Sequence, residues 1–166
     1  MSTAGHAGVR PHRGGPEWAA YSDARHAGAG QFAYASLIGL KSFNAISLHE
    51  AAKAGLTFRK FELLQRALDL PASTMAEIIQ IPPRTLQRRK EAGRLAPDES
   101  DRLLRSTRLV GMALELFEGD LDAARTWLAT PRGALGGATP LDLLQTEPGA
   151  QEVENLIGRL EHGVVA

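Results

Sequence analysis

The stretch 127–144 restricts the fold more than any other part of the chain. A helical segment ends near Trp127, Pro131 stops it, and Thr139 caps a new helix after a glycine-rich turn. Within that turn, Gly136-Gly137 suit the positive φ angles that a tight connection between helices requires. A compact unit of short helices is therefore expected near the C-terminus.

The chain reads as helical nearly throughout from Ser47 onward, and no convincing strand is found. Capping boxes are expected at Ser47 with Glu50 and at Thr74 with Glu77. The sequence therefore predicts an all-α fold. Helices are expected from Ser47 to Gly55, Thr57 to Pro71, Thr74 toward Pro82, Pro83 to Gly93, Pro97 to Gly119, Asp120 to Leu128, over one to two turns after Thr139, and from Pro148 to Gly163.

Composition favours a soluble protein of the cytoplasm. The chain has no cysteine, which excludes a disulfide framework and a thiolate zinc site. No apolar run approaches the roughly 20 residues of a membrane span, so no membrane partner is expected. No paired acid and base, metal-ligand cluster or nucleophile motif stands out, so we expect neither an enzyme nor a bound metal or cofactor.

The chain divides by composition and charge. Residues 1–30 are rich in Gly, Ala, His and Arg without periodicity and are expected to form a flexible arm. Between Arg84 and Arg108, eight basic residues stand against four acidic ones, whereas three basic residues face nine acidic ones from Leu109 onward. The segregation indicates either two faces with different partners or two solvated surfaces that happen to differ. Domains are expected over 31–108 and 109–166.

The first of these domains contains a pattern typical of a helix-turn-helix. Ala76 stands at the small position where the two helices approach closely. Gln80 departs from the pattern where a turn glycine is common, and Arg89 departs from it where a core residue is usual. The apolar positions are occupied by Met75, Ile79, Ile81 and Leu86.

With Leu86 inward, a step of about 100° per residue turns a polar face outward. Arginine can pair with guanine, glutamine with adenine, and threonine with phosphate. The alternative is a solvated basic helix within a bundle. The candidate DNA-binding residues are Arg84, Thr85, Gln87 and Arg88, with Arg94 and Arg102 (and, beside them, Arg105) as phosphate contacts.

The chain from Ser47 to Val164 resembles the Xre/ParS-type antitoxins of RES-domain toxin–antitoxin pairs. The resemblance implies a bacterial antitoxin that forms a homodimer, binds operator DNA to repress its own operon, and neutralises a cognate RES-domain toxin that consumes NAD. Its most specific residues are the ordered set Ala124, Trp127-Leu128, Pro131, Leu135-Gly136-Gly137, Pro140, Leu144, Gly149, Val153, Leu156 and Gly163.

The resemblance also implies that the C-terminal helices cover the toxin's NAD cleft, so the NAD chemistry belongs to the partner. The candidates for obstruction are Arg159, Glu161, His162, Gly163 and Val164, followed by Val165-Ala166. Further candidates for toxin contact are Trp127, Leu135, Gly136 and Leu144, whose alternative role is the core of a small domain.

The rival from another class is a stand-alone helix-turn-helix regulator whose C-terminal domain dimerises or senses a ligand. In either case we expect a homodimer, because helix-turn-helix proteins usually read two half-sites. The long helix after Pro97 offers Leu109, Met112 and Phe117 as one dimer surface.

Overall fold

The computed structural model describes residues 16–164, and within them the chain is helical, without a strand. The expected all-α fold is confirmed. A lone antiparallel bridge joins Thr57 and Arg94. In chain order the elements are α1 (Pro16–His26), the 3-10 segment η1 (Gly30–Ile38), α2 (Ala45–Ala54), α3 (Phe58–Leu68), α4 (Ala72–Ile78), α5 (Pro83–Ala92), α6 (Pro97–Leu116), α7 (Leu121–Leu128), the 3-10 turn η2 (Gly133–Leu135), α8 (Pro140–Leu143) and α9 (Glu147–Glu161).

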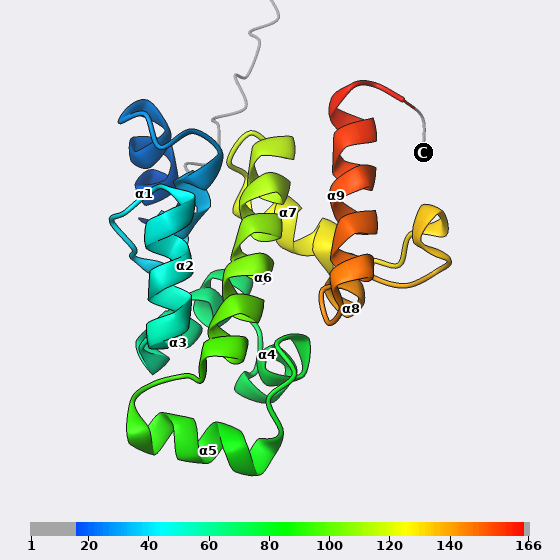
Figure 1. The fold of residues 1–166 in the computed structure, drawn as a ribbon. Helices are drawn as coiled ribbons and strands as arrows, with labels where there is room; N and C mark the ends of the chain where they lie inside the picture. The colour runs from blue at the N-terminus through cyan, green and yellow to red at the C-terminus, as the bar shows by residue number, and fades with distance from the viewer. Residues whose placement is uncertain (1–15, 165–166) are drawn as a thin grey trace, which may run out of the picture.

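Helix α6 runs through the centre of the molecule, between α2 and α9 (Figure 1). Its apolar residues recur at helical spacing, and Leu103, Leu109 and Leu114 are fully buried in the core. Of the three residues expected at a dimer surface, Leu109 is excluded because it has no exposed surface. Met112 and Phe117 are half-buried, and the Phe117 ring lies 6.4 Å from the Trp127 ring.

Several helix boundaries lie where their capping residues are expected. Gly55 and Gly93 end α2 and α5 with φ angles of 82° and 72°. Thr139 and Asp142 form the capping box of α8. These ends are predictable because each depends on a cap encoded next to the helix.

The starts of α2 and α4 lie upstream of the expected capping boxes. Asn44 caps α2 instead, because its Oδ1 accepts a 2.9 Å hydrogen bond from the N–H of Ser47. Helix α4 begins at Ala72, directly after Pro71, rather than at Thr74. Proline lacks an N–H that the first helical turn would leave unpaired, so a helix can begin directly after it.

Residues 16–30 do not form a flexible arm, contrary to expectation. They hold α1 and the start of η1, which pack against each other. Tyr21 is 4% exposed, and its ring stacks on Trp18 with centroids 5.4 Å apart. The helix escapes sequence analysis because its buried face is made partly of small alanines such as Ala24. The rest of the expected arm, residues 1–15, lies outside the described residues.

Within residues 16–164, no helix combines the length and the apolar character that crossing a membrane requires.

Candidate functional site

The helix-turn-helix expected from the sequence is formed by α4, α5 and the turn between them. Ala76 is 3% exposed at the small position, and Met75 and Ile79 are fully buried near it. In the turn, Gln80 is exposed and adopts a left-handed conformation with a φ of 56°. Glycine is common at this position because it adopts that conformation without strain. The turn therefore requires a left-handed backbone conformation at residue 80, and in this chain a glutamine adopts it.

Helix α5 is attached to the rest of the molecule by few contacts. None of its residues is buried, and Thr85, Leu86 and Arg89 are half-buried on the side that faces the protein. After its last turn, the carbonyl of Gly93 accepts a 2.9 Å hydrogen bond from the N–H of Phe58. Helix α5 also packs against α4, and it lies at one end of the molecule (Figure 1).

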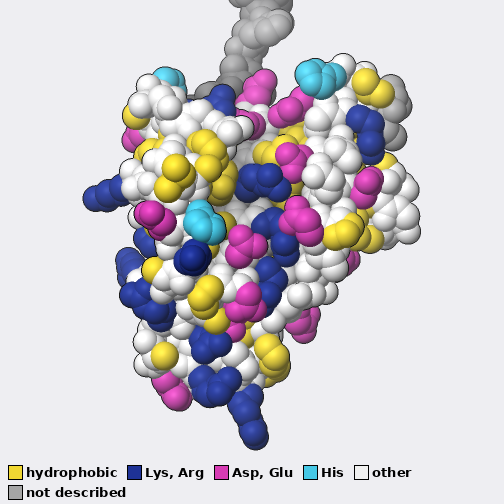
Figure 2. All heavy atoms as spheres, viewed as in Figure 1, with side chains coloured by type: hydrophobic (Ala, Val, Ile, Leu, Met, Phe, Trp, Pro, Cys, Tyr) yellow, Lys and Arg dark blue, Asp and Glu magenta, His cyan; other side chains and the backbone are white. Residues whose placement is uncertain are grey.

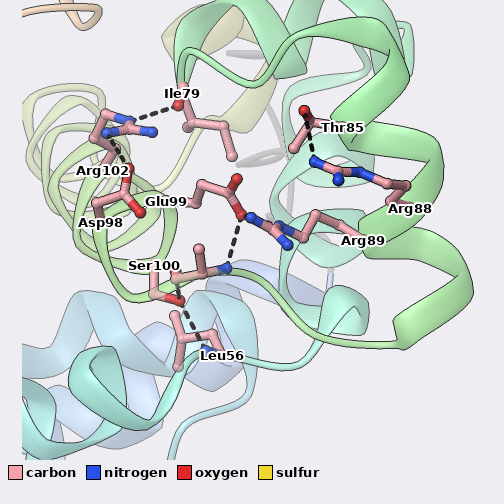
Figure 3. Close-up of polar contacts among 10 residues, drawn as sticks. Leu56, Ile79, Thr85, Arg88, Arg89, Asp98, Glu99, Ser100 and Arg102 are labelled. Atoms are coloured by element: carbon pink, nitrogen blue, oxygen red, sulfur yellow. Dashed lines mark hydrogen bonds and ion pairs between the residues drawn. The ribbon is translucent and has the colours of Figure 1, made fainter.

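Arg89 pairs with a buried carboxylate, which explains its departure from the apolar residue usual at this position. Its Nε donates a 2.8 Å hydrogen bond to Oε2 of Glu99, and the same oxygen accepts a 2.7 Å hydrogen bond from the N–H of Ala96 (Figure 3). Glu99 is 5% exposed at the start of α6. The hydrogen bond to Glu99 raises the pKa of Arg89, so this arginine remains a cation at any physiological pH.

The outward face of α5 carries the residues expected there. Arg84, Gln87 and Arg88 are exposed, and Lys90, which the sequence analysis did not single out, is exposed as well. Figure 2 shows Lys and Arg side chains gathered at this end of the molecule. Nη2 of Arg88 lies 3.4 Å from Oγ1 of Thr85. The face is therefore basic and accessible.

A carboxylate also lies on this outward face. Glu91 is exposed, and its Oε1 accepts a 2.9 Å hydrogen bond from Nε2 of Gln87. The Gln87 amide must give up this bond before it can pair with a base.

Arg94 and Arg102 are occupied by contacts within the protein. Nη1 of Arg94 donates to the carbonyls at the end of α2, those of Ala54 and Gly55. Nε of Arg102 donates a 2.7 Å hydrogen bond to the carbonyl of Ile79, and its Nη1 lies 3.0 Å from Asp98. Both arginines thus hold neighbouring helix ends together. The sequence could not show this, because the acceptors are main-chain carbonyls of distant residues.

Arg105, named beside them, pairs with an acidic side chain. Its Nη1 lies 2.8 Å from Oε2 of Glu147 at the start of α9.

The apolar residues considered for toxin contact lie inside the C-terminal unit. Trp127 is 6% exposed, Leu135 is 9% exposed and Leu144 is fully buried. The guanidinium carbon of Arg132 lies 5.3 Å from the centre of the Trp127 ring, which covers the ring further. These positions match the alternative that the sequence left open, the core of a small domain.

The turn before α8 has the expected backbone. Gly136 and Gly137 are exposed and have φ angles of 67° and 85°. The expectation of positive φ is confirmed for both.

The remaining candidates gather at the C-terminal end of α9. Glu161, His162 and Gly163 are exposed there, and Arg159 is half-buried one turn earlier. Val164 is 53% exposed next to them. Val165-Ala166 lie outside the described residues. Figure 1 places this end of α9 at the end of the molecule opposite α5.

A hollow between the N-terminal elements and α9 contains none of the residues predicted to bind DNA or toxin (Figure 2). Its cavity of about 360 Å³ is lined from α1, η1, α6 and α9. Arg25 pairs with Glu115 at 2.8 Å and Arg108 with Glu154 at 3.1 Å among its lining residues. Burial raises the pKa of Tyr34, which also lines it. Its cations are satisfied internally, and no sequence motif points to it, because its residues come from four separate elements.

Two family models match the chain in succession. The antitoxin Xre-like helix-turn-helix domain matches residues 47–108, which contain α5. The antitoxin Xre/MbcA/ParS C-terminal toxin-binding domain matches residues 112–163, which contain α9.

Three relatives resemble the chain over most of their length. A protein of Yersinia enterocolitica named Antitoxin Xre is 40% identical over 128 residues, covering 76% of this chain and 86% of that protein. An Antitoxin Xre of Photorhabdus laumondii is 35% identical over 130 residues, covering 78% and 88%. A Sphingobium protein named Prs ADP-ribosylating antitoxin is 26% identical over 148 residues, covering 84% and 91%.

Proposed function

This chain belongs to the Xre/MbcA/ParS family of antitoxins, and we propose that it neutralises a cognate RES-domain toxin and represses its own operon in the cytoplasm. The observation that carries the proposal is the separation of two exposed surfaces. The basic face of α5 lies at one end of the molecule and the C-terminal end of α9 at the other (Figure 1). One chain can therefore engage two partners without a conflict between them.

The DNA-reading part of the proposal rests on the outward residues of α5. Arg84 and Arg88 carry the guanidinium groups that bind guanine edges or phosphates, and Gln87 carries an amide that suits adenine. Thr85, also predicted to contact DNA, is half-buried on the inner side of α5, so we assign it no direct contact with a base. Arg94 and Arg102 would act on DNA only through atoms not engaged by the helix ends they hold, so we assign them a supporting position.

The neutralising part of the proposal rests on the exposed end of α9. Arg159, Glu161 and His162 supply polar groups that compete for an NAD cleft, and Val164 supplies an apolar contact next to them. The name of the Sphingobium relative refers to ADP-ribosylation, a transfer that draws its ADP-ribose from NAD. A toxin that uses NAD fits that relative's name, and covering the cleft would stop the reaction.

Domains over 31–108 and 109–166 would share one continuous element. The boundary between them falls inside α6 (Pro97–Leu116), and the two family matches end and begin at residues 108 and 112 of the same helix. We propose that α6 keeps the two binding surfaces at a fixed separation.

We further propose a homodimer, because two half-sites related by a twofold axis are the usual target of helix-turn-helix proteins. Light scattering of the free protein should give about twice the mass of the 17.8 kDa chain. The toxin-bound assembly should contain two antitoxin chains. A monomer at micromolar concentration in both conditions would contradict this part of the proposal.

A paired experiment separates the two activities. Arg84→Ala and Arg88→Ala should each weaken binding to the promoter of the chain's own operon by about 1–3 kcal/mol and leave capture of the co-expressed toxin unchanged. Arg159→Ala removes one positive charge at the opposite end of the molecule. It should weaken capture of the toxin and leave promoter binding unchanged. Gel-shift titration and affinity capture measure the two effects. A wild-type complex that prefers its promoter no more than random DNA would refute the DNA-reading part.

A further inference from the structure

The attachment of α5 is unusual for a helix that would read DNA. Such a helix is normally held by apolar residues on its inner side, but α5 has no buried residue. Its inner side consists of Thr85, Leu86 and Arg89, each half-buried. The strongest directed contact among them is the 2.8 Å hydrogen bond from Arg89 to Glu99. The orientation of α5 therefore depends on this charged pair as well as on Leu86, which packs against the core.

Glu99 is well placed to hold α5, because it is itself fixed. It stands in the first turn of α6, where its Oε2 also accepts the N–H of Ala96 at 2.7 Å. The next residue, Ser100, accepts a 2.8 Å hydrogen bond from the N–H of Leu56 through its Oγ, which joins this turn to the loop after α2 (Figure 3). A carboxylate that is 5% exposed is costly unless it is paired, so its surroundings favour a conformation in which Arg89 reaches it.

This pair sets the rotation of α5 about its own axis. At about 100° per residue, fixing Arg89 inward places Gln87 about 160°, Arg84 about 140° and Arg88 about 100° away from it around the helix. The observed exposure agrees, since these three residues are exposed. A different rotation would turn one of the arginines toward the protein and lower the number of groups presented outward.

We propose that Glu99 is a positioning residue for DNA reading, which holds the recognition helix in its binding rotation through Arg89 although it never touches DNA. The inference rests on the proposed DNA-binding function of α5. If the pair is lost, the binding-competent orientation is populated for only part of the time, and the apparent affinity falls by that fraction.

The inference and simple electrostatics predict opposite results for Glu99→Gln. Removing a negative charge near the DNA should tighten binding if charge alone matters. Loss of positioning should instead weaken promoter binding about tenfold, because the neutral amide oxygen of glutamine accepts from Arg89 without the charge that strengthens the bond. Asp101→Asn is the matched control, because Asp101 is exposed two residues further along α6. It should bind as tightly as the wild type or slightly more tightly.

Arg89→Lys provides a second variant with unchanged charge. Lysine lacks the planar fork that directs Nε at Glu99, so the variant should also lose promoter affinity. The slope of affinity against salt concentration should stay at its wild-type value, because Arg89 neutralises no phosphate. Both variants should keep the wild-type unfolding temperature to within a few degrees and should still capture toxin.

Hydrogen exchange of the full-length chain tests, in the absence of DNA, whether Glu99 holds α5 in place. In Glu99→Gln the amides of α5 should exchange faster, while those of the second half of α6 keep their protection. Unchanged exchange in α5, or promoter binding by Glu99→Gln as tight as or tighter than that of the wild type, would overturn the inference. A wild-type protein without promoter preference would instead refute the proposed function, and exchange would still decide the role of Glu99.

Discussion

Gln80 occupies the turn of the helix-turn-helix in a backbone conformation that suits glycine better. Its φ of 56° lies in the left-handed region, where a side chain crowds the following carbonyl. The side chain is exposed, so packing does not offset this strain. The residue is therefore a site where stability can be gained by one substitution.

We expect Gln80→Gly to raise the free energy of unfolding by about 0.5–1 kcal/mol, the left-handed strain removed less the extra chain entropy of glycine. Thermal unfolding followed by circular dichroism should show a midpoint higher by a few degrees. Gln87→Gly is the matched control in the middle of α5 and should lower stability by about 1 kcal/mol. Equal losses in both variants would show that the conformation of Gln80 carries no strain.

At this scale the sequence predicts the solvent-facing side of α5 but not the partners of its arginines. Helical spacing alone places Arg84 and Arg88 outward, and both are exposed. Arg89 and Arg102 could not be interpreted in this way. Their partners, Glu99 in α6 and the carbonyl of Ile79 after the end of α4, are brought close only by the tertiary fold.

Helix α1 illustrates what the sequence misses at the scale of the element. Ends marked by a strong cap or a glycine are predictable, as at Gly93, because the signal is local. Helix α1 has little periodic apolar pattern, and it is held by contacts with distant residues. The backbone of Gly119, after α6, has a φ of +87° and leaves room for the Trp18 ring.

We expect Gly119→Ala to disturb the docking of α1. A Cβ at this position would lie 2.3 Å from Cε2 of Trp18, so the ring or the backbone must move, at a cost of about 1–3 kcal/mol in addition to the strain of positive φ. Gly137→Ala is the control, since its φ is +85° and a Cβ there meets no atom within 4 Å.

Chemical denaturation of the two variants separates the cost of the clash with Trp18 from the cost of a positive φ angle. Gly119→Ala should be less stable than Gly137→Ala, and only Gly119→Ala should change the tryptophan fluorescence of the folded protein. Equal stability losses would mean that Trp18 does not pack against Gly119.

The whole molecule presents its two proposed binding surfaces at opposite ends of the fold (Figure 1). Basic side chains gather over α5, and the region around α7–α9 carries the excess of acidic residues (Figure 2). Composition alone left open whether this segregation reflects two partners. The fold separates the two surfaces in space, and the matches to a helix-turn-helix domain and a toxin-binding domain assign a different role to each region.

The most direct test of this account is growth rescue during induction of the cognate toxin, with each antitoxin variant expressed from an unrelated promoter. Deleting residues from Arg159 onward removes the exposed end of α9 together with Leu160, which packs against the core. Truncation after Gly163 removes only the tail. Comparing the two truncations shows how much of the protection depends on the end of α9 and how much on the tail. The double variant Arg84→Ala, Arg88→Ala serves as the control at the opposite end, with protein levels and toxin capture checked for each.

The account predicts that the larger truncation fails to protect cells while the α5 double variant protects them as well as the full chain. Full protection by the chain that lacks Arg159 and everything after it would contradict the assignment of neutralisation to the end of α9.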